Sequence, residues 1–429
     1  MNHLYGTSAD IDSRYAWSRL LSAALIGTIG NVGMWSVVVV LPAVQAEFGV
    51  DRGSASLPYT LTLLGFGFGG VIAGRLADRF GVMLPVIGGA ISIGLGYIAT
   101  GYSQSLLQFA IAHGLLIGLL GTSTMFAPLL ADITHWFDRR RGIALAICAS
   151  GNYMSGTLWP PILQHSIDTY GWRTTHMMLG IFCTVALLIL APLLQRRPPH
   201  ASPGAAAGAT VAAAPSPALL RLKPGTLQFL LIVAGLACCV AMSMPQVHIV
   251  AYCADLGFGA QRGAEMLSLM LGFGIVSRLI SGWVSDKIGG LKTLLLGSTL
   301  QGIALLLYIP FDGLASLYVV SALFGLFQGG IVPSYALIVR EYFSPKEAGA
   351  RVGVVLMATL FGMALGGWLS GVIFDYTGSY QAAFLNGIAW NLLNIGIVVC
   401  LLWRRRVGQR RQPQRTMRPP QRRGALARA

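Results

Sequence analysis

The stretch Leu269–Gly290, with the sequence LMLGFGIVSRLISGWVSDKIGG, contains the two features that decide the fold of this 429-residue chain. The first is an apolar run with one charged residue, Arg278, in its interior, and the second is a polar turn around Asp286 that ends the run. In hydrocarbon an uncompensated guanidinium costs several kcal/mol, so such an arginine faces a bundle interior or a water-filled cavity. We therefore expect a membrane helix in which Arg278 points toward other helices.

The composition of the whole chain agrees with that expectation. Hydrophobic residues make up 55% of it and charged residues only 10%, whereas ordinary globular domains carry about 25% charged residues. An all-α membrane protein follows, because lipid offers no partner to the unpaired backbone groups of loops or open sheets. The net charge of +15 does not indicate nucleic-acid binding, since the basic residues gather in the tail after Trp403 and in segments that flank apolar runs, next to anionic lipid head groups.

Twelve apolar runs of about 20 residues are long enough to span a bilayer. They are approximately Leu20–Ala43, Ser54–Gly74, Leu84–Thr100, Leu106–Ala131, Gly142–Ser166, Trp172–Leu194, Thr226–Tyr252, Ala264–Trp283, Thr293–Pro310, Ala315–Val339, Gly349–Phe374 and Gln381–Trp403. The first run is expected to be a membrane helix and not a cleaved signal peptide, because acidic residues precede it and many runs follow. An even number of spans places both termini on one side of the membrane.

The distribution of basic residues predicts which side that is. With alternate loops assigned to opposite faces, nearly all Lys and Arg residues lie on the side of the termini, and only Arg52, Arg173 and Arg262 lie on the other. Cytoplasmic loops carry an excess of Lys and Arg, so we expect both termini and the central loop in the cytoplasm.

An internal repeat divides the chain into two similar parts. The octapeptide GRLADRFG at Gly74–Gly81 recurs as GWVSDKIG at Gly282–Gly289, an offset of 208 residues, and the same offset places Glu47 opposite Asp255. Such a parallel repeat predicts two six-helix halves.

The predicted domain boundaries follow from this repeat and from low-complexity sequence. We expect an N-terminal half at 1–195, a flexible linker at 196–225, a C-terminal half at 226–403 and a basic disordered tail at 404–429. Within the linker, Ala201–Ala218 is so rich in Ala, Gly and Pro that it cannot build a packed core.

The two octapeptides resemble the cytoplasmic loop signature of the major facilitator superfamily, Gly-x-Leu-Ala-Asp-Arg-x-Gly followed by basic residues. The resemblance implies the major facilitator fold, with 12 transmembrane helices and a substrate site between two halves that rock. Asp78 with Arg79, and Asp286 with Lys287, would then latch the cytoplasmic side by binding the amides and basic residues of neighbouring helices. A capped turn with a topology-setting cation is the alternative. The first copy lacks the basic pair that completes the signature, so its latch is expected to be weaker.

A narrower resemblance involves Met244–Gly257, the Arg278 helix and Gly329–Phe343, which are similar to the monocarboxylate transporters and their bacterial relatives, close to the oxalate:formate antiporters. In these families an arginine of the eighth helix binds the substrate carboxylate, and Arg278 falls on that position. The residues agree, because the repeat places Gly70 opposite Arg278, and the planar guanidinium matches a carboxylate. An arginine bonded to helix carbonyls or snorkelling to the surface is the alternative.

The eleventh apolar run refines the expected substrate. Carriers that resemble the oxalate transporters have a lysine in that helix, whereas Gly349–Phe374 contains only Arg351, at its start. One deep positive charge favours a monoanion.

Further candidates are polar and aromatic residues on the helices that line the cavity in this fold. These substrate-binding candidates are Asn31, Trp35, Asn152, Tyr153, His248, Tyr252, Gln328 and Tyr335. A lone asparagine or tyrosine in a membrane helix can equally serve as interhelical glue. His248 can also titrate near neutral pH. Asp255 matches an aspartate implicated in proton coupling in bacterial relatives, although its repeat mate Glu47 suggests a plain loop carboxylate.

These observations predict a secondary transporter that moves a small organic monocarboxylate by alternating access, with proton symport, as a monomer in the lipid of a bacterial inner membrane. A proton-coupled drug or metabolite exporter, an organic-anion exchanger and a transport-dead sensor or scaffold are the alternatives. No enzyme activity, metal site, cofactor or nucleic-acid partner is expected, since the sequence contains no phosphate-binding loop and no convincing catalytic triad. The six cysteines show neither metal-ligand nor disulfide spacing.

Overall fold

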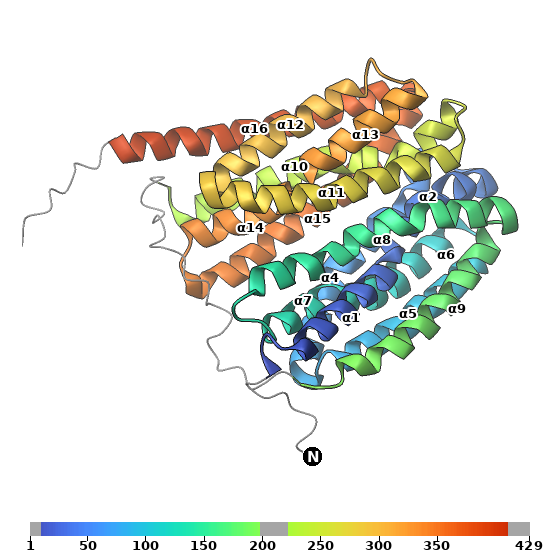
Figure 1. The fold of residues 1–429 in the computed structure, drawn as a ribbon. Coiled ribbons are helices and arrows are strands. Elements are labelled where there is room, and N and C mark those ends of the chain that lie inside the picture. Colours follow the sequence, from blue (N-terminus) through green and yellow to red (C-terminus); the bar gives the residue numbers. More distant parts are fainter. Residues whose placement is uncertain (1–9, 198–221, 411–429) are drawn as a thin grey trace, which may run out of the picture.

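The computed structural model describes residues 10–197 and 222–410, and this part of the chain is almost entirely helical. We call residues 10–197 the N-terminal half and residues 222–410 the C-terminal half. Both described pieces begin and end at the left of Figure 1, which we call the terminal side, and the opposite end of the bundle is the distal side. The predicted tether Ala201–Ala218 and residues 411–429 of the predicted tail lie outside the described residues.

Six spans form the N-terminal half, and several of them consist of more than one helical segment. Their segments in chain order are α1 (Arg14–Gly30), α2 (Val32–Phe48), α3 (Arg52–Ala55), α4 (Leu57–Phe80), α5 (Met83–Gly101), α6 (Leu106–Ile111), the π-helix η3 (Ala112–Gly121), the 3-10 helix η4 (Thr122–Met125), α7 (Ala127–Thr134), α8 (Arg141–Tyr170), α9 (Trp172–Leu190) and the 3-10 helix η5 (Ala191–Leu194).

Six spans also form the C-terminal half, with a single break. Their segments are α10 (Pro224–Asp255), α11 (Ala260–Ile288), α12 (Gly290–Leu307), α13 (Leu314–Gln328), α14 (Ile331–Tyr342), α15 (Pro345–Thr377) and α16 (Tyr380–Arg410). The helix α16 continues past Trp403, where the tail was expected to begin, because no proline interrupts the chain before Pro413.

Each of the twelve predicted spans coincides with helix. Eleven spans in the described part of the chain are long and apolar enough to cross a membrane. The other span is α8, which is 30 residues long but contains two internal prolines and polar residues such as Asn152 and Asp168. It lies between other helices, packed against α1, α2 and α11. Its exposed side chains include Ile143, Leu158 and Ile162, so one face of α8 stays apolar while its polar residues lower its mean hydropathy.

Five predicted spans, the first, second, fourth, sixth and tenth, consist of more than one helical segment. The tenth span breaks at Gly329 and Gly330, between α13 and α14. A Cβ atom at Gly329 would lie 2.3 Å from the carbonyl oxygen of Gly274, and one at Gly330 would lie 2.0 Å from Oγ of Ser281. These two glycines therefore allow the tenth span to approach α11 closely, on the turns that flank Arg278.

Buried apolar side chains reveal how the two halves meet. On the distal side one cluster, which we call the joint cluster, contains residues of both halves, such as Trp35, Tyr153 and Leu271. Two further clusters each belong to one half and reach its terminal end, one around Trp136 in the N-terminal half and one around Tyr342 in the C-terminal half. The halves thus share a cluster on the distal side and have separate clusters on the terminal side.

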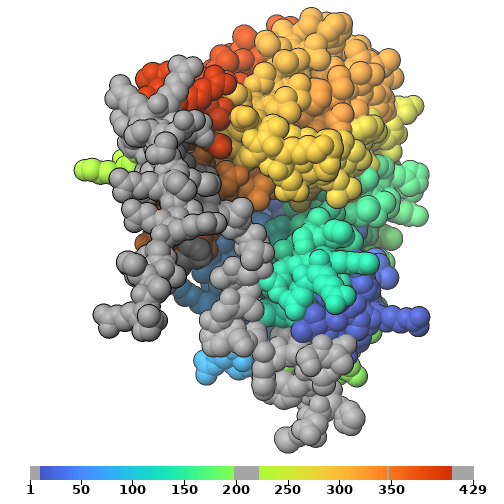
Figure 2. All heavy atoms as spheres, turned by 60° about the vertical axis from the view of Figure 1, so that its left-hand side comes forward, coloured from blue at the N-terminus to red at the C-terminus, as the bar shows by residue number. Residues whose placement is uncertain are grey.

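The seam between the halves runs along three pairs of spans. The helix α8 packs against α11, α15 packs against α3 and α4, and α2 packs against α10. Figure 2 turns the terminal side forward and shows the C-terminal half, in yellow to red, above the N-terminal half, in blue to green. A molecule built this way can open on one side when its halves tilt about the distal contacts.

Candidate functional site

Arg278 lies on α11 where this helix faces α8. The carbon atom of its guanidinium is 3.9 Å from the centroid of the Tyr153 ring, and Nη1 donates a hydrogen bond of 3.2 Å to the carbonyl oxygen of Ala149. Its Nε is buried without a hydrogen-bond partner. Among the described residues no carboxylate forms an ion pair with Arg278. An arginine offers five N–H donors, so most of this donor capacity is available to a ligand.

The depth of Arg278 in the bundle is set by its neighbours on α8. Tyr153 belongs to the joint cluster, whereas Cys148 belongs to the cluster of the N-terminal half on the terminal side. Arg278 packs against Tyr153 and Ala149. It therefore lies at the boundary between the joint cluster and the cluster of the N-terminal half.

Gly274 determines what lies beside Arg278. A Cβ atom at this position would be 2.3 Å from Cε1 of Tyr153 and 2.7 Å from its Cδ1. The aromatic ring thus occupies the space that a side chain at residue 274 would need. An aromatic π face, and not an acidic side chain, therefore lies next to the guanidinium. The ring orients the cation without neutralising its charge.

Trp35 of α2 contacts Asn152 on another face of α8. The indole Nε1 of Trp35 donates to the backbone oxygen and to Oδ1 of Asn152, both at 3.2 Å. Because Tyr153 follows Asn152 in the helix, the two face different helices, as predicted. The structure therefore places Trp35 with Asn152 between α2 and α8, and Tyr153 with Arg278 between α8 and α11.

Asn31 lies at the break between α1 and α2. Its Nδ2 donates to the carbonyl oxygens of Gly27 at 2.7 Å and of Met125 at 3.5 Å, while Oδ1 is buried without a partner. The donor bonds satisfy backbone groups at the kink and join the first span to the fourth.

Gln328 pairs with a residue that the sequence analysis missed, Gln246 on α10. Nε2 of Gln246 donates to Oε1 of Gln328 at 3.0 Å, and the remaining amide atoms, Oε1 of Gln246 and Nε2 of Gln328, are buried without partners. The signal for Gln246 was its place two residues before His248. Tyr335 is separate, because its hydroxyl donates to Oδ1 of Asn394 at 2.8 Å inside the C-terminal half.

His248 and Tyr252 lie in the joint cluster region on the distal side, apart from the Arg278 group. Both ring nitrogens of His248 have partners: Nε2 bonds to the carbonyl oxygen of Gly367 at 2.8 Å, and Nδ1 to the Tyr380 hydroxyl at 3.2 Å. The Tyr252 ring packs edge-on against the rings of Tyr380 and Phe384. These contacts stabilise the packing of α10 on α15 and α16.

Asp255 ends α10 and bonds to Arg52 of the other half. The guanidinium of Arg52 donates to its two oxygens at 3.0 and 3.2 Å. Its repeat mate Glu47 pairs instead with Arg173, at 2.7 Å, inside the N-terminal half. The repeat therefore does not make these two carboxylates equivalent. All three arginines expected only as distal loop charges are ion-paired, since Arg262 bonds to a glutamate on α11 at 3.0 Å.

The predicted latch residues lie exposed at the terminal ends of α4 and α11. Asp78 and Asp286 accept no hydrogen bond from other described residues, and the ammonium group of Lys287 lies 3.7 Å from the centroid of the Trp283 ring. Arg79 lies over the neighbouring Phe80 ring. The halves are separate here, so the latching role stays a prediction.

A carboxylate that the sequence analysis left without a role lies beside the second latch. Oε1 of Glu341 accepts the backbone N–H of Gly290 at 2.9 Å, at the start of α12.

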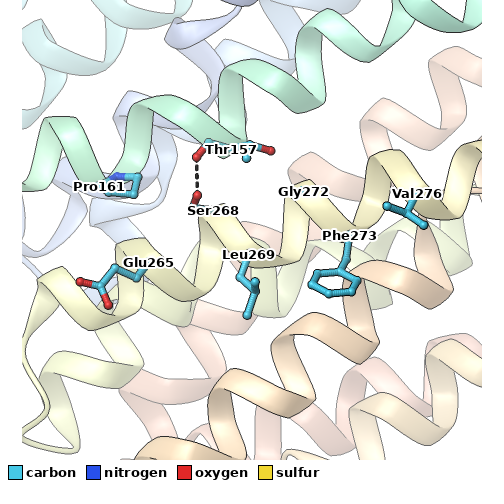
Figure 3. A pocket seen from close by; sticks show the side chains of 8 residues that line it. All are labelled: Thr157, Pro161, Glu265, Ser268, Leu269, Gly272, Phe273 and Val276. Atoms are coloured by element: carbon cyan, nitrogen blue, oxygen red, sulfur yellow. Dashed lines mark hydrogen bonds between the residues drawn. The ribbon is translucent and has the colours of Figure 1, made fainter.

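A groove follows the seam of α8 and α11 on the distal side (Figure 3). It has a volume of about 400 Å³ and is lined by Thr157, Pro161, Glu265, Ser268, Leu269, Gly272, Phe273 and Val276. Within it, the Ser268 hydroxyl donates to the carbonyl oxygen of Thr157 and joins the two helices. The side chains of Phe273 and Val276 are exposed. The groove therefore opens toward lipid and is distinct from the surroundings of Arg278.

The described residues contain no group of three or more His, Cys, Asp or Glu side chains that could hold a metal ion. Five of the six cysteines are buried, and Cys400 is exposed.

Comparison with known proteins supplies the family context. The family model described as "Major Facilitator Superfamily" matches residues 23–314 and 266–427. Monocarboxylate transporter 13 of Bos taurus is 28% identical over 91% of this chain and 90% of its own length. Monocarboxylate transporter 11 of Mus musculus is 26% identical over 87% and 84%, and the uncharacterized MFS-type transporter YcxA of Bacillus subtilis (strain 168) is 27% identical over 79% and 83%.

Solved structures show the same fold. A bacterial homolog of the human lysosomal transporter Spinster, in an inward-facing and unoccupied conformation, matches with a TM-score of 0.70 over 93% of this chain and 98% of that one. The same homolog in its occupied conformation matches with a TM-score of 0.63. The identities are 14% and 15%, so this likeness concerns the fold alone. The predicted twelve-helix fold is confirmed.

Proposed function

The chain belongs to the major facilitator superfamily, and we propose that it moves a small organic monocarboxylate across the membrane by alternating access. It is a multi-pass membrane transporter and not an enzyme. The proposal concerns its substrate, its coupling and its orientation.

The observation that carries the substrate proposal is the state of Arg278. Its Nε is buried without a partner, its one hydrogen bond to a described residue goes to a backbone carbonyl, and no carboxylate of the described residues neutralises it. A cation at this depth is costly unless an anion joins it. A substrate carboxylate would supply that charge and would match the planar fork of the guanidinium with two parallel hydrogen bonds.

The charge of the substrate follows from the neighbouring helices. Arg351 is the one basic residue in Gly349–Phe374, and it is already paired with Glu347 on the terminal side, at 2.8 Å. A dicarboxylate bound to Arg278 would carry its second charge into the bundle without a second cation. A monoanion fits this arrangement. The relatives named as monocarboxylate transporters support the same substrate class.

The other walls of the proposed site come from both halves. Tyr153 would orient Arg278, while Trp35 and Asn152 would shape the side formed by α2 and α8. The unpaired amide atoms of Gln246 and Gln328 offer one acceptor and one donor to polar groups of the substrate.

We propose that the terminal side faces the cytoplasm of a bacterial cell and that the protein works in the inner membrane as a monomer. The excess of Lys and Arg on this side supports the orientation. In that orientation the described conformation is closed toward the outside.

Proton symport is the coupling that we propose, with anion exchange as the alternative. Asp255 is the carboxylate best suited to this role, because its cationic partner Arg52 belongs to the other half. When the halves separate on the distal side, Asp255 loses that partner.

Uptake into proteoliposomes tests this function. A radiolabelled panel of lactate, pyruvate, acetate, benzoate, oxalate and a neutral sugar would be measured with and without an inward proton gradient. We expect one monocarboxylate to be taken up, faster with the gradient, and this uptake to be lost in Arg278→Ala but kept in Arg173→Ala, which removes an arginine outside the proposed site. Uptake that survives Arg278→Ala, or that is confined to neutral or cationic compounds, would favour a drug or metabolite exporter.

A further inference from the structure

Arg52 opens the short helix α3 on the distal side of the N-terminal half, yet its side-chain hydrogen bonds and ring contacts lie in the C-terminal half. Its guanidinium donates to both oxygens of Asp255, at 3.0 and 3.2 Å, and to the Tyr380 hydroxyl at 2.6 Å. The same group lies 4.7 Å from the centroid of the Phe374 ring. One side chain thus bridges the halves to α10, α15 and α16.

The backbone around Arg52 is held by the same half. The amide groups of Arg52 and Gly53 donate to Oδ1 and Oδ2 of Asp375, at 2.8 and 2.7 Å. A Cβ atom at Gly53 would lie 2.7 Å from Cγ2 of Val372, and one at Gly371 would lie 2.8 Å from the carbonyl oxygen of Arg52. The two backbones touch here, so neither can shift without breaking this set of bonds.

The C-terminal partners are themselves fixed in place. The Tyr380 hydroxyl that receives the Arg52 bond is also bonded to Nδ1 of His248, and the other nitrogen of this histidine is bonded to the carbonyl oxygen of Gly367. The acceptors therefore form a rigid receptor for one arginine, and His248 acts as its support.

We propose that Arg52 is the distal lock of the transporter, whose release from Asp255, Asp375 and Tyr380 opens the distal side. The inference rests on alternating access, which is part of the proposed function. In the opposite state the joint cluster would divide, and the contacts of Arg52 and Gly53 with the C-terminal half would have to separate, because Arg52 moves with one half and its partners with the other.

The burial of the two charges suits a bond that must break and re-form. The Asp255 side chain is 37% exposed and lies next to water, whereas the Arg52 side chain is 8% exposed, so the carboxylate is already partly hydrated when the pair parts. The ion pair between Arg19 and Asp132 differs, with side chains 0% and 6% exposed in the interior of one half. A pair enclosed in that way loses its compensation if it breaks, which suits a permanent contact.

A matched control is present on the same side of the molecule. Arg173 and Glu47 form a distal ion pair of 2.7 Å, but both residues belong to the N-terminal half. Breaking this pair removes a similar interaction without affecting the seam. A change in the balance between closed and open states should therefore follow from loss of Arg52 and not from loss of Arg173.

The test measures the distal opening directly. Tyr102 in the N-terminal half and Tyr376 in the C-terminal half are 72% and 88% exposed, and both would be replaced by cysteine and spin-labelled in a Cys400→Ser background. Double electron–electron resonance in nanodiscs without substrate then gives the distance distribution. We expect mainly one short distance in the parent protein, an open-to-closed ratio raised about tenfold in Arg52→Gln, and no change in Arg173→Gln.

A distance distribution in Arg52→Gln equal to that of the parent would overturn the proposal. If this variant does not fold, Asp255→Asn decides the question, since it removes the same ion pair while keeping the shape of the side chain. The experiment uses no substrate, so its failure is independent of whether Arg278 binds a carboxylate. If Arg278 does not bind a carboxylate, the expected spin-label distances stay the same.

Discussion

At the scale of single residues, the proposed site depends on Arg278 and on the Tyr153 ring next to it. The guanidinium has a π face, one carbonyl and unused donors as its surroundings. The ring of Tyr153 and the lack of a side chain at Gly274 determine that environment, and each position can be changed separately.

Replacing Tyr153 by leucine should weaken substrate binding while Tyr153→Phe should not. A cation–π contact is worth about 0.5–2 kcal/mol, so loss of the ring should raise KM roughly two- to thirtyfold. The measurement is the concentration dependence of initial uptake in proteoliposomes. Equal damage from both variants would show that the hydroxyl matters and that the ring does not.

Gly274→Ala should impair uptake more than the same change two residues away. The new methyl would lie 2.3 Å from the Tyr153 ring, whereas Gly272→Ala meets Thr157 at an ordinary 3.4 Å. The displaced ring would leave Arg278 without its orienting contact. Uptake rates of the two variants, normalised to the amount of protein in the vesicles, provide the comparison. Equal rates would contradict the role given to the ring.

The sequence identified some of these residues better than others. Arg278 was predictable because an arginine inside an apolar run is costly and therefore noticeable. The stacking of Tyr153 was not, since adjacent residues in α8 face different helices and only packing selects the partner. His248 had the right chemistry for a site, but both its nitrogens are used in contacts with residues more than 100 positions away in the chain.

At the scale of helices, length and apolarity predicted every span but not where spans break. Glycine is frequent in membrane helices, so a pair of glycines in the tenth run did not distinguish a break from a close contact. In the structure Gly329 and Gly330 form the break between α13 and α14 and also make the close contact with α11. The extension of α16 to Arg410 was likewise hidden by the arginines that follow Trp403.

Gly329→Ala should destabilise the protein. Its Cβ would lie 2.3 Å from a backbone oxygen of α11, which cannot rotate away, and such overpacking costs about 1–3 kcal/mol. We expect a lower apparent Tm, measured in detergent from the intrinsic fluorescence of the protein. Gly353→Ala, whose Cβ would meet nothing within 4 Å, is the control. An unchanged Tm in Gly329→Ala would contradict the close contact.

At the scale of the whole molecule, the repeat predicted two similar sets of six helices but not the differences between them. Asp255 and Glu47 occupy matching positions, yet one bonds across the seam and the other within its half. Arg52 appeared in the sequence only as a loop charge. Contacts between distant parts of the chain decide these roles, and a single sequence does not reveal them.

Such asymmetry is useful to a transporter. A lock needs its two sides on different halves, and a binding residue leaves its neutralisation to the substrate instead of to a fixed partner. The closed distal side, the separate clusters on the terminal side and the unpaired Arg278 between them describe one state of such a cycle.

The most direct test of the central claim is binding of the acid that the uptake panel identifies to purified protein, with Arg278→Ala beside Arg173→Ala. Loss of one partner of a desolvated charge pair costs about 2–5 kcal/mol, so we predict at least about thirtyfold weaker binding in Arg278→Ala and unchanged affinity in Arg173→Ala. Equal affinity in wild type and Arg278→Ala would contradict the claim that this arginine binds the substrate carboxylate.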